Sequence, residues 1–316
     1  MLHHRRFVGR STLRALCLAS AALALVGSGL SAGRALAEPA AAAAPAPSAF
    51  SSDRLSVVVE GQGPDVILIP GFASSRDVWR AEADRLKATH RVHLVQLAGF
   101  AGEPWTHGDG PFVQPVIDDL ARYIREEGLN APAIIGHSMG GMSALMLAQQ
   151  HPELVGKVMT VDSLPFFSAL FGPQVTVEAA RPFADQAAAR ILSSSDADFR
   201  AGQVQASAGY SKTPATQAAM VDWSMAGDRH AMAAAIREVM TTDLRPGLAA
   251  MTTPVWAPYA SDADGGAPAA MADGVWSREY ASLPNVRLIR VDDSRHFIMA
   301  DQPARFAAIV DQFLAP

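Results

Sequence analysis

A serine between two glycines is the feature of this sequence with the clearest chemical use. Gly136-His-Ser-Met-Gly140 follows the apolar residues 131–135 and precedes an amphipathic stretch. G-x-S-x-G between a strand and a helix forms a nucleophile elbow, whose tight turn needs small flanking residues and raises the serine hydroxyl above the sheet edge. The helix that begins there adds free N–H groups and partial positive charge. The pattern predicts Ser138 as a nucleophile; the alternative is a glycine turn with a bystander serine.

The elements that must position this serine alternate along the chain. Short β-rich runs are followed by helical stretches, which predicts an α/β fold with a mostly parallel sheet covered on both faces. Residues 163–250 interrupt the alternation and are interpreted as an inserted helical cap. Strands are predicted over residues 55–61, 65–71, 91–97, 131–137, 157–162, 253–260 and 285–291, and helices over 74–90, 113–127, 140–150 and 303–313.

The first 37 residues have the order of a secretory signal peptide. Four arginines without an acid precede an apolar stretch over 15–30, and Ala35-Leu-Ala37 supplies a small-x-small cleavage site. The run is short for a membrane span, so cleavage after Ala37 is preferred to an anchor. Residues 38–52, rich in Ala and Pro, are read as a flexible linker. Residues 53–316 then form the folded domain of an exported, periplasmic or secreted protein.

Charge and cysteine content exclude other classes of protein. The 316 residues carry 26 basic and 31 acidic side chains, a formal net charge of −5, which argues against a general nucleic-acid binder. Removal of residues 1–37 takes away five arginines and no acids, so the mature chain stands at −10. The same cut removes Cys17, the one cysteine, which excludes a disulfide scaffold. No metal-ligand spacing or dinucleotide motif is present, and no metal or cofactor is expected.

Three segments together resemble the α/β-hydrolase superfamily. They are GHSMGG after a buried strand, PGFASSRDVW at 70–79, and DDSRHF at 292–297. The resemblance covers residues from about 55 to 316. It implies an eight-stranded, mostly parallel sheet and a triad in the chain order serine, acid, histidine.

The resemblance also implies a base and an acid. His296 follows the last predicted strand, where the family's loop delivers the base, whereas His137 lies inside the elbow and is expected to point elsewhere. The acid usually follows the strand at 253–260, which indicates Asp262, with Asp264 and Asp162 as alternatives. Ala260 stands where the family's acid loop normally has glycine, a departure that weakens the assignment of Asp262.

The remaining site residues are carried over in the same way. The oxyanion hole is expected from the backbone N–H groups of Met139 and Phe72, because Pro70-Gly71-Phe72 replaces the commoner His-Gly-x. Phe166, Phe167 and Trp223 of the predicted cap are candidates for an apolar substrate pocket.

These observations lead to one preferred function. The sequence predicts a serine hydrolase that cleaves small-molecule carboxylic esters with an apolar acyl or alcohol part through an acyl-enzyme. The alternatives are a C–C bond hydrolase, an amide hydrolase or an acyltransferase on the same fold, and a non-catalytic binding protein. Neither a nucleic-acid partner nor a stable membrane anchor after cleavage is expected.

Overall fold

A computed structural model describes residues 50–316, which fall in one compact unit spanning Pro45–Pro316. The predicted signal peptide and most of the predicted linker lie outside these residues.

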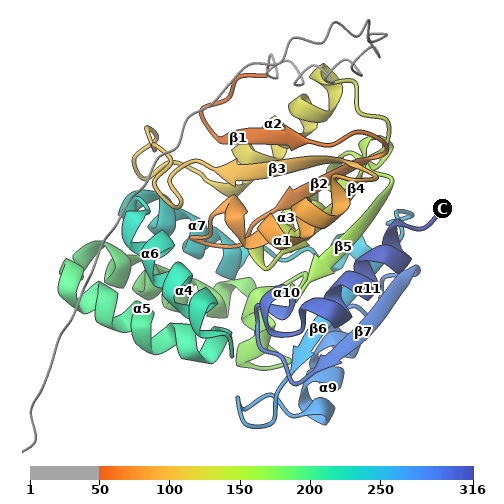
Figure 1. Cartoon of the computed structure of the whole chain (residues 1–316). Helices are drawn as coiled ribbons and strands as arrows, with labels where there is room; N and C mark the ends of the chain where they lie inside the picture. Colours follow the sequence, from red (N-terminus) through yellow and green to blue (C-terminus); the bar gives the residue numbers. More distant parts are fainter. Residues whose placement is uncertain (1–49) are drawn as a thin grey trace, which may run out of the picture. The chain divides into compact units, whose positions relative to one another are not determined.

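Seven strands form one sheet at the centre of the unit (Figure 1). Their order is β1-β3-β2-β4-β5-β6-β7; β1 runs antiparallel to β3 and every other pair is parallel. The mostly parallel sheet was predicted correctly, with one strand fewer in residues 50–316 than the resemblance implies. The strands are β1 (Leu55–Glu60), β2 (Asp65–Ile69), β3 (Arg91–Leu97), β4 (Ala133–His137), β5 (Lys157–Val161), β6 (Val255–Ser261) and β7 (Val286–Asp292).

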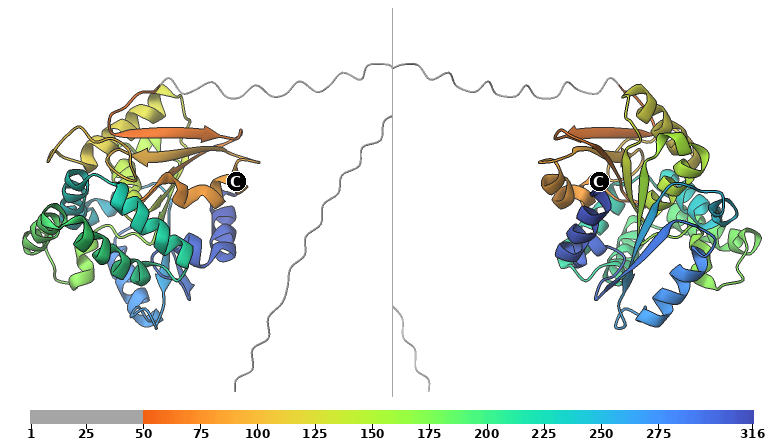
Figure 2. Two further views of the ribbon diagram at one scale, coloured as in Figure 1. Left: turned by 60° about the vertical axis from the view of Figure 1, so that its left-hand side comes forward. Right: turned by 90° about the vertical axis from the view of Figure 1, so that its right-hand side faces the viewer.

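Helices cover both faces of the sheet (Figure 2). On one face lie α1 (Arg80–Leu86) and α11 (Pro303–Leu314), where the Trp79 and Phe306 rings stack with centroids 6.1 Å apart. The opposite face carries α2 (Val113–Glu126), α3 (Met139–Gln150) and α9 (Ala269–Glu279). Buried apolar strands require this two-sided cover.

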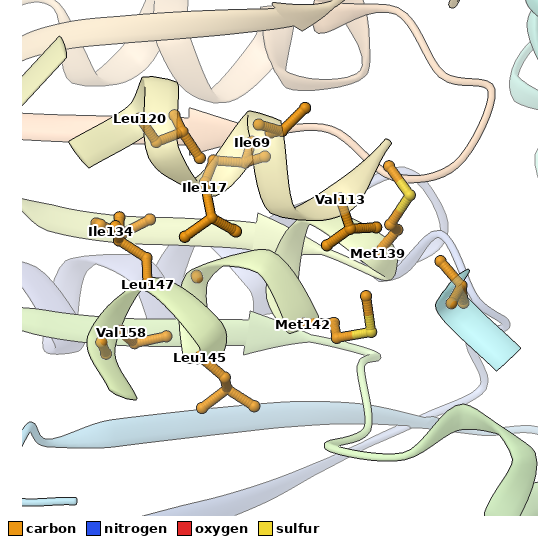
Figure 3. Packing of buried hydrophobic residues seen from close by; sticks show 14 of the residues in the cluster. Ile69, Val113, Ile117, Leu120, Ile134, Met139, Met142, Leu145, Leu147 and Val158 are labelled. Carbon is orange, nitrogen blue, oxygen red and sulfur yellow. The ribbon is translucent and has the colours of Figure 1, made fainter. Parts of the chain in front are cut away.

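The apolar stripe of α2 explains how α3 is held against the sheet. Val113, Ile117 and Leu120 recur at helical spacing and are buried, as are Val116 and Ile124 beside them. Figure 3 shows Val113, Ile117 and Leu120 close to Ile69 of β2, Ile134 of β4 and the α3 side chains. The helix α3 therefore packs against both α2 and the sheet.

The interval between β5 and β6 contains four long helices, here called the insertion helices. They are α4 (Val177–Ser193), α5 (Asp196–Tyr210), α6 (Pro214–Ala226) and α7 (Arg229–Thr241). Three begin at side-chain caps: Thr176, Ser195 and Asp228 accept bonds from backbone N–H groups of the first turn, while Pro214 opens α6.

The insertion helices contact loops at the carboxyl ends of distant strands. Asp228 N donates to Gly99 O (2.8 Å), just after β3, and Phe297 N donates to Tyr210 O (3.1 Å), just after β7. Because parallel strands end at the same edge, the insertion lies over the edge where the predicted site residues gather.

Short helices complete the described chain. They are the 3₁₀ segments η1 (Arg76–Trp79), η2 (Pro152–Leu154) and η3 (Phe167–Phe171), and the single turns α8 (Arg245–Leu248) and α10 (Ile298–Asp301). The helix predicted over 74–90 is thus divided into η1 and α1. None of the helices in residues 50–316 has the length and apolar character needed to cross a membrane.

Tyr280, at the end of α9, is buried in the core and forms hydrogen bonds with residues at the end of β5. Its side chain is fully buried, and its hydroxyl donates to Ser163 O (2.9 Å) and accepts from Thr160 Oγ1 (2.9 Å). Burial raises the pKa of this phenol, which keeps it a donor.

We therefore expect Tyr280→Phe to lower the free energy of unfolding by about 1–3 kcal/mol, because it leaves a buried carbonyl unpaired. Urea unfolding followed by circular dichroism measures the change. Tyr210→Phe is the control, since its ring is half exposed and its hydroxyl bonds to no residue within 50–316. Equal effects of the two substitutions would contradict the role of the Tyr280 hydroxyl.

Candidate active site

Ser138 occupies the single residue between β4 and α3. Its φ of 54° and ψ of −123° are sparsely populated torsions for a residue with a side chain. Its N–H donates to Val161 O (2.9 Å), and its carbonyl accepts from Gly141 N, Met142 N and Ser163 Oγ at 2.9, 3.1 and 2.7 Å. These four bonds hold the strained turn, as a nucleophile elbow requires.

The two motif glycines allow the elbow to approach its neighbours. A Cβ on Gly140 would lie 2.4 Å from Ile69 O and 2.5 Å from Pro70 O, and one on Gly136 would lie 2.2 Å from Gly140 O. These contacts are with backbone atoms that cannot move aside cheaply. The glycines are therefore needed to seat α3 against the end of β2.

His296 lies in the loop between β7 and α10 and is bound by Asp162. Its Nδ1 is 2.6 Å from Asp162 Oδ2. A carboxylate can only accept, so Nδ1 carries the proton, and in the neutral ring Nε2 keeps a lone pair. This is the tautomer that can take a proton from a serine hydroxyl.

Asp162 is itself held by backbone groups of β6. The residue directly follows β5 with a φ of 44°, and its N–H donates to Pro258 O (2.8 Å). Its Oδ1 accepts from Ala260 N (2.9 Å), while Oδ2 faces the imidazole. The carboxylate is thus fixed at both oxygens.

Asp262, the first choice from the sequence, does not bind His296, and the prediction of that contact is wrong. Asp262 closes a tight turn through two backbone bonds with Ala267, both 2.9 Å. Its Oδ2 accepts from Arg295 Nε (2.7 Å), and Lys212 Nζ lies 3.7 Å from Oδ1. The hydrogen bond from Arg295, and then the charge of Lys212, lower the pKa of Asp262. Asp264 is exposed in the same turn.

The two predicted oxyanion donors belong to segments that adjoin the serine. Met139 N is the first N–H of α3, and Phe72 belongs to the loop after β2, where a Cβ on Gly71 would lie 3.1 Å from Ser138 Cβ. Neither N–H has a hydrogen-bond partner in the part of the chain that the structure describes. Two unpaired donors therefore belong to the segments that adjoin the nucleophile.

The three candidate pocket residues fall in different apolar clusters. Phe166 is fully buried against Ala169 and Ala180, with the Arg245 guanidinium 4.5 Å above its ring. Phe167 packs against the cluster that contains the α2 and α3 side chains, and Trp223 packs against the cluster that contains those of α1 and α11. Within residues 50–316 these side chains do not form one cluster, and Phe166 serves the packing of the insertion.

Two residues at the site make contacts that the sequence did not predict. His137 Nε2 lies 3.0 Å from His296 O, and Asp301 Oδ2 accepts from Arg295 N (2.9 Å). Asp301 Oδ1 also accepts from Ser211 Oγ (2.6 Å) and Lys212 N (2.9 Å), which ties the insertion to the loop that carries His296. The contact of His137 with His296 and those of Asp301 with Ser211 and Lys212 join positions about 90 or more residues apart, and no spacing in the sequence signals them.

The described residues contain no group of three or more His, Cys, Asp or Glu side chains that could hold a metal ion.

Comparison with known proteins agrees with the fold described above. A family model described as the alpha/beta hydrolase family matches residues 66–309. The fold resembles that of the enol-lactonase from Burkholderia xenovorans LB400 (TM-score 0.67, 16% identity, 82% of this chain and 96% of that one). It is equally similar to a thermophilic esterase from Thermogutta terrifontis (TM-score 0.68, 19% identity, 82% and 92%).

The chain belongs to the alpha/beta hydrolase family. Among curated relatives, it is 34% identical over 122 residues to pimeloyl-(acyl-carrier protein) methyl ester esterase of Vibrio atlanticus. That match spans 39% of this chain and 45% of the relative, so the chain matches less than half of the relative's length.

The burial of His137 makes stability depend on pH. Burial, and then the charge of His296, lower the pKa of His137 well below its ordinary value. The unfolded chain therefore takes up a proton near pH 6.5 that the folded chain does not, so stability is lost as the pH falls.

We expect the free energy of unfolding to fall below about pH 6.5 by up to about 1.4 kcal/mol per pH unit from this residue. Urea unfolding at a series of pH values measures the slope, and His137→Gln removes this contribution. His93, whose pKa burial also lowers, is present in both proteins and cancels in the difference. Parallel pH curves for wild type and variant would contradict the expectation.

Proposed function

We propose that this protein is an exported serine hydrolase that cleaves carboxylic esters through an acyl-enzyme. The proposal rests on the Asp162–His296 hydrogen bond beside an elbow serine, in the chain order Ser138, Asp162, His296. An imidazole held with its proton on Nδ1 is the group that activates a serine hydroxyl.

In the first half of the reaction, Ser138 Oγ attacks the acyl carbon while His296 Nε2 takes the hydroxyl proton. The Ser138–His296 hydrogen bond forms when substrate enters, since such bonds tighten in the Michaelis complex. The N–H groups of Phe72 and Met139 bind the developing oxyanion. Protonated His296 then gives its proton to the departing alkoxide, and an acyl-serine remains.

The second half repeats these steps with water. His296 Nε2 removes a proton from the water molecule, whose oxygen attacks the acyl-serine carbonyl. The same two N–H groups bind the second tetrahedral intermediate, and the proton returns to Ser138 Oγ as the carboxylic acid leaves. Throughout, the Asp162 carboxylate stabilises the imidazolium and stays ionised.

A neutral ester with an apolar acyl or alcohol part fits the surroundings of the serine best. Phe72 contacts Phe100 edge-on, with centroids 5.6 Å apart, and buried Met139 follows the serine. The nearby cations Arg295 and Lys212 pair with Asp262, so they do not offer a free anion site. The names of relatives, an esterase and an enol-lactonase, support this class of substrate.

Export to the periplasm or the medium is part of the proposal. It is supported by the basic, apolar and small-residue pattern of residues 1–37.

The same residues could serve C–C bond hydrolysis, amide hydrolysis or acyl transfer, because each passes through an acyl-serine or an oxyanion at the same donors. A non-catalytic binding protein would not need the Nδ1–H tautomer that Asp162 imposes, and this observation favours an enzyme. Product analysis with added alcohol separates hydrolysis from acyl transfer.

We expect the mature protein to react with a fluorophosphonate and to hydrolyse p-nitrophenyl esters, with a preference set by acyl chain length. Ser138→Ala should abolish labelling and lower kcat/KM by about 10³-fold or more, because no other group in the elbow can form the acyl-enzyme. Ser143→Ala, a buried serine of α3 bonded to Met139 O, is the control and should keep its labelling. Labelling that survives Ser138→Ala would exclude this nucleophile.

The two aspartates give opposite expectations. In Asp162→Asn, the amide oxygen stays with Ala260 N–H, so the NH₂ group faces His296 Nδ1 and forces the wrong tautomer. We expect kcat to fall by about 10²–10⁴-fold. Asp262→Asn should keep kcat within about fivefold, because it leaves the Asp162–His296 bond intact and changes only the charge that faces Arg295 and Lys212. Steady-state kinetics on one p-nitrophenyl ester compares them; the reverse order would restore Asp262 as the acid.

A further inference from the structure

His137 is a buried histidine at the site to which the proposed mechanism gives no chemical step. It is the last residue of β4 and directly precedes Ser138. Its Nε2 lies 3.0 Å from the backbone carbonyl oxygen of His296. Since a carbonyl can only accept, Nε2 carries a proton and donates it. The residue before the nucleophile is thus bonded to the backbone of the base.

The ring of His137 is enclosed on its other sides. Its centroid lies 4.5 Å from that of His296 and 4.6 Å from that of Phe297. Its Nδ1 is buried and has no hydrogen-bond partner in residues 50–316, and a Cβ on Gly71 would lie 2.9 Å from it. The ring therefore fills the space between the base loop and the loop that carries Phe72, with one hydrogen bond that fixes its orientation.

The backbone of His296 needs this hydrogen bond from His137 because Asp162 binds His296 only at the imidazole ring. A ring with one hydrogen bond can still move with its backbone. The flanking N–H groups are held by other segments: Arg295 N by Asp301, and Phe297 N by Tyr210 O. Of these three backbone contacts, the one from His137 comes from the residue directly before Ser138, so it sets the distance between nucleophile and base.

We propose that His137 is a positioning residue that holds the His296 backbone in register with Ser138 through its Nε2–H. This inference rests on the proposed roles of Ser138 and His296. Its chemical requirement is a neutral donor of imidazole length at position 137. A glutamine amide reaches a similar place and can donate; a leucine fills the volume and cannot.

Two substitutions test the donor. His137→Leu should lower kcat for a p-nitrophenyl ester, and the rate of fluorophosphonate labelling, by about tenfold to a hundredfold, as expected for a displacement of about 1 Å between reacting groups. KM should change far less, because the substitution alters the spacing of the reacting groups and not a contact with substrate. His137→Gln should recover most of kcat. Equal kcat in wild type and His137→Leu, or equal losses in the Leu and Gln variants, would overturn the proposal.

A control separates positioning from simple loss of stability. His93→Leu removes another buried histidine, bonded to Asp65 (2.9 Å) and Tyr123 (2.6 Å) on β3, away from the site. It should lower the free energy of unfolding and leave kcat within about twofold. If both leucine variants lose kcat in proportion to stability, the effect of His137 is structural only.

Proton NMR gives a readout of the base itself. The Nδ1 proton of His296, bound to Asp162, should give a low-field resonance in wild type and in His137→Gln that broadens or disappears in His137→Leu. In the wild-type protein, ¹⁵N-histidine NMR should show His137 as the neutral Nε2–H tautomer at the pH of maximal activity. The Nδ1–H tautomer or an imidazolium at His137 would overturn the proposal even if no variant folds.

The same assays distinguish failure of the proposed function. If His296→Ala keeps full activity, the assignment of the base is wrong, whatever position 137 does. If His296→Ala abolishes activity while His137→Leu behaves as wild type, the base is correct and His137 does not position it.

Discussion

The turn at Ser138 is the constraint on which the other features of the site depend. The chain passes from β4 to α3 within one residue, and this is possible because Gly140 lies against the carbonyl oxygens of Ile69 and Pro70. This one backbone arrangement then determines the positions of three groups. Met139 N–H is left unpaired at the helix start, Ser138 stands at the sheet edge, and His137 on the opposite face of the strand points into the base loop.

The parallel sheet brings the remaining groups to that edge. Asp162 follows β5, the strand next to β4, and His296 follows β7, two strands further on. The insertion helices leave the sheet after Asp162 and return before β6, and they contact the same edge through Tyr210 and the Ser211–Asp301 bond (Figure 1). A movement of the insertion helices would therefore displace the loop that carries His296.

The features of the site that the sequence could predict are those that depend on residues close together in the chain. Ser138 and the strands could be predicted because the elbow and the apolar runs are local patterns. The acid could not be predicted, because Asp162 and Asp262 both follow parallel strands that end at one edge of the sheet. Which of them binds His296 depends on backbone torsion and on hydrogen-bond partners. Asp162 has a positive φ that turns it toward the imidazole, whereas Asp262 is bound by Arg295. His137 was set aside for a related reason, since its partner is a backbone oxygen 159 residues away.

Although Asp262 does not bind the imidazole, its position still bears on the chemistry. Arg295 precedes His296, and an unpaired guanidinium there would oppose the imidazolium that forms as Ser138 gives up its proton. Asp262 binds Arg295 at 2.7 Å and lies 3.7 Å from the Lys212 ammonium, so it balances positive charge beside the base. Two carboxylates therefore contact the loop after β7: Asp162 binds the ring of His296, and Asp262 binds Arg295. Asp162 fixes the tautomer of His296. Asp262 offsets the positive charge of Arg295 and Lys212 beside the imidazole ring, which must itself become charged.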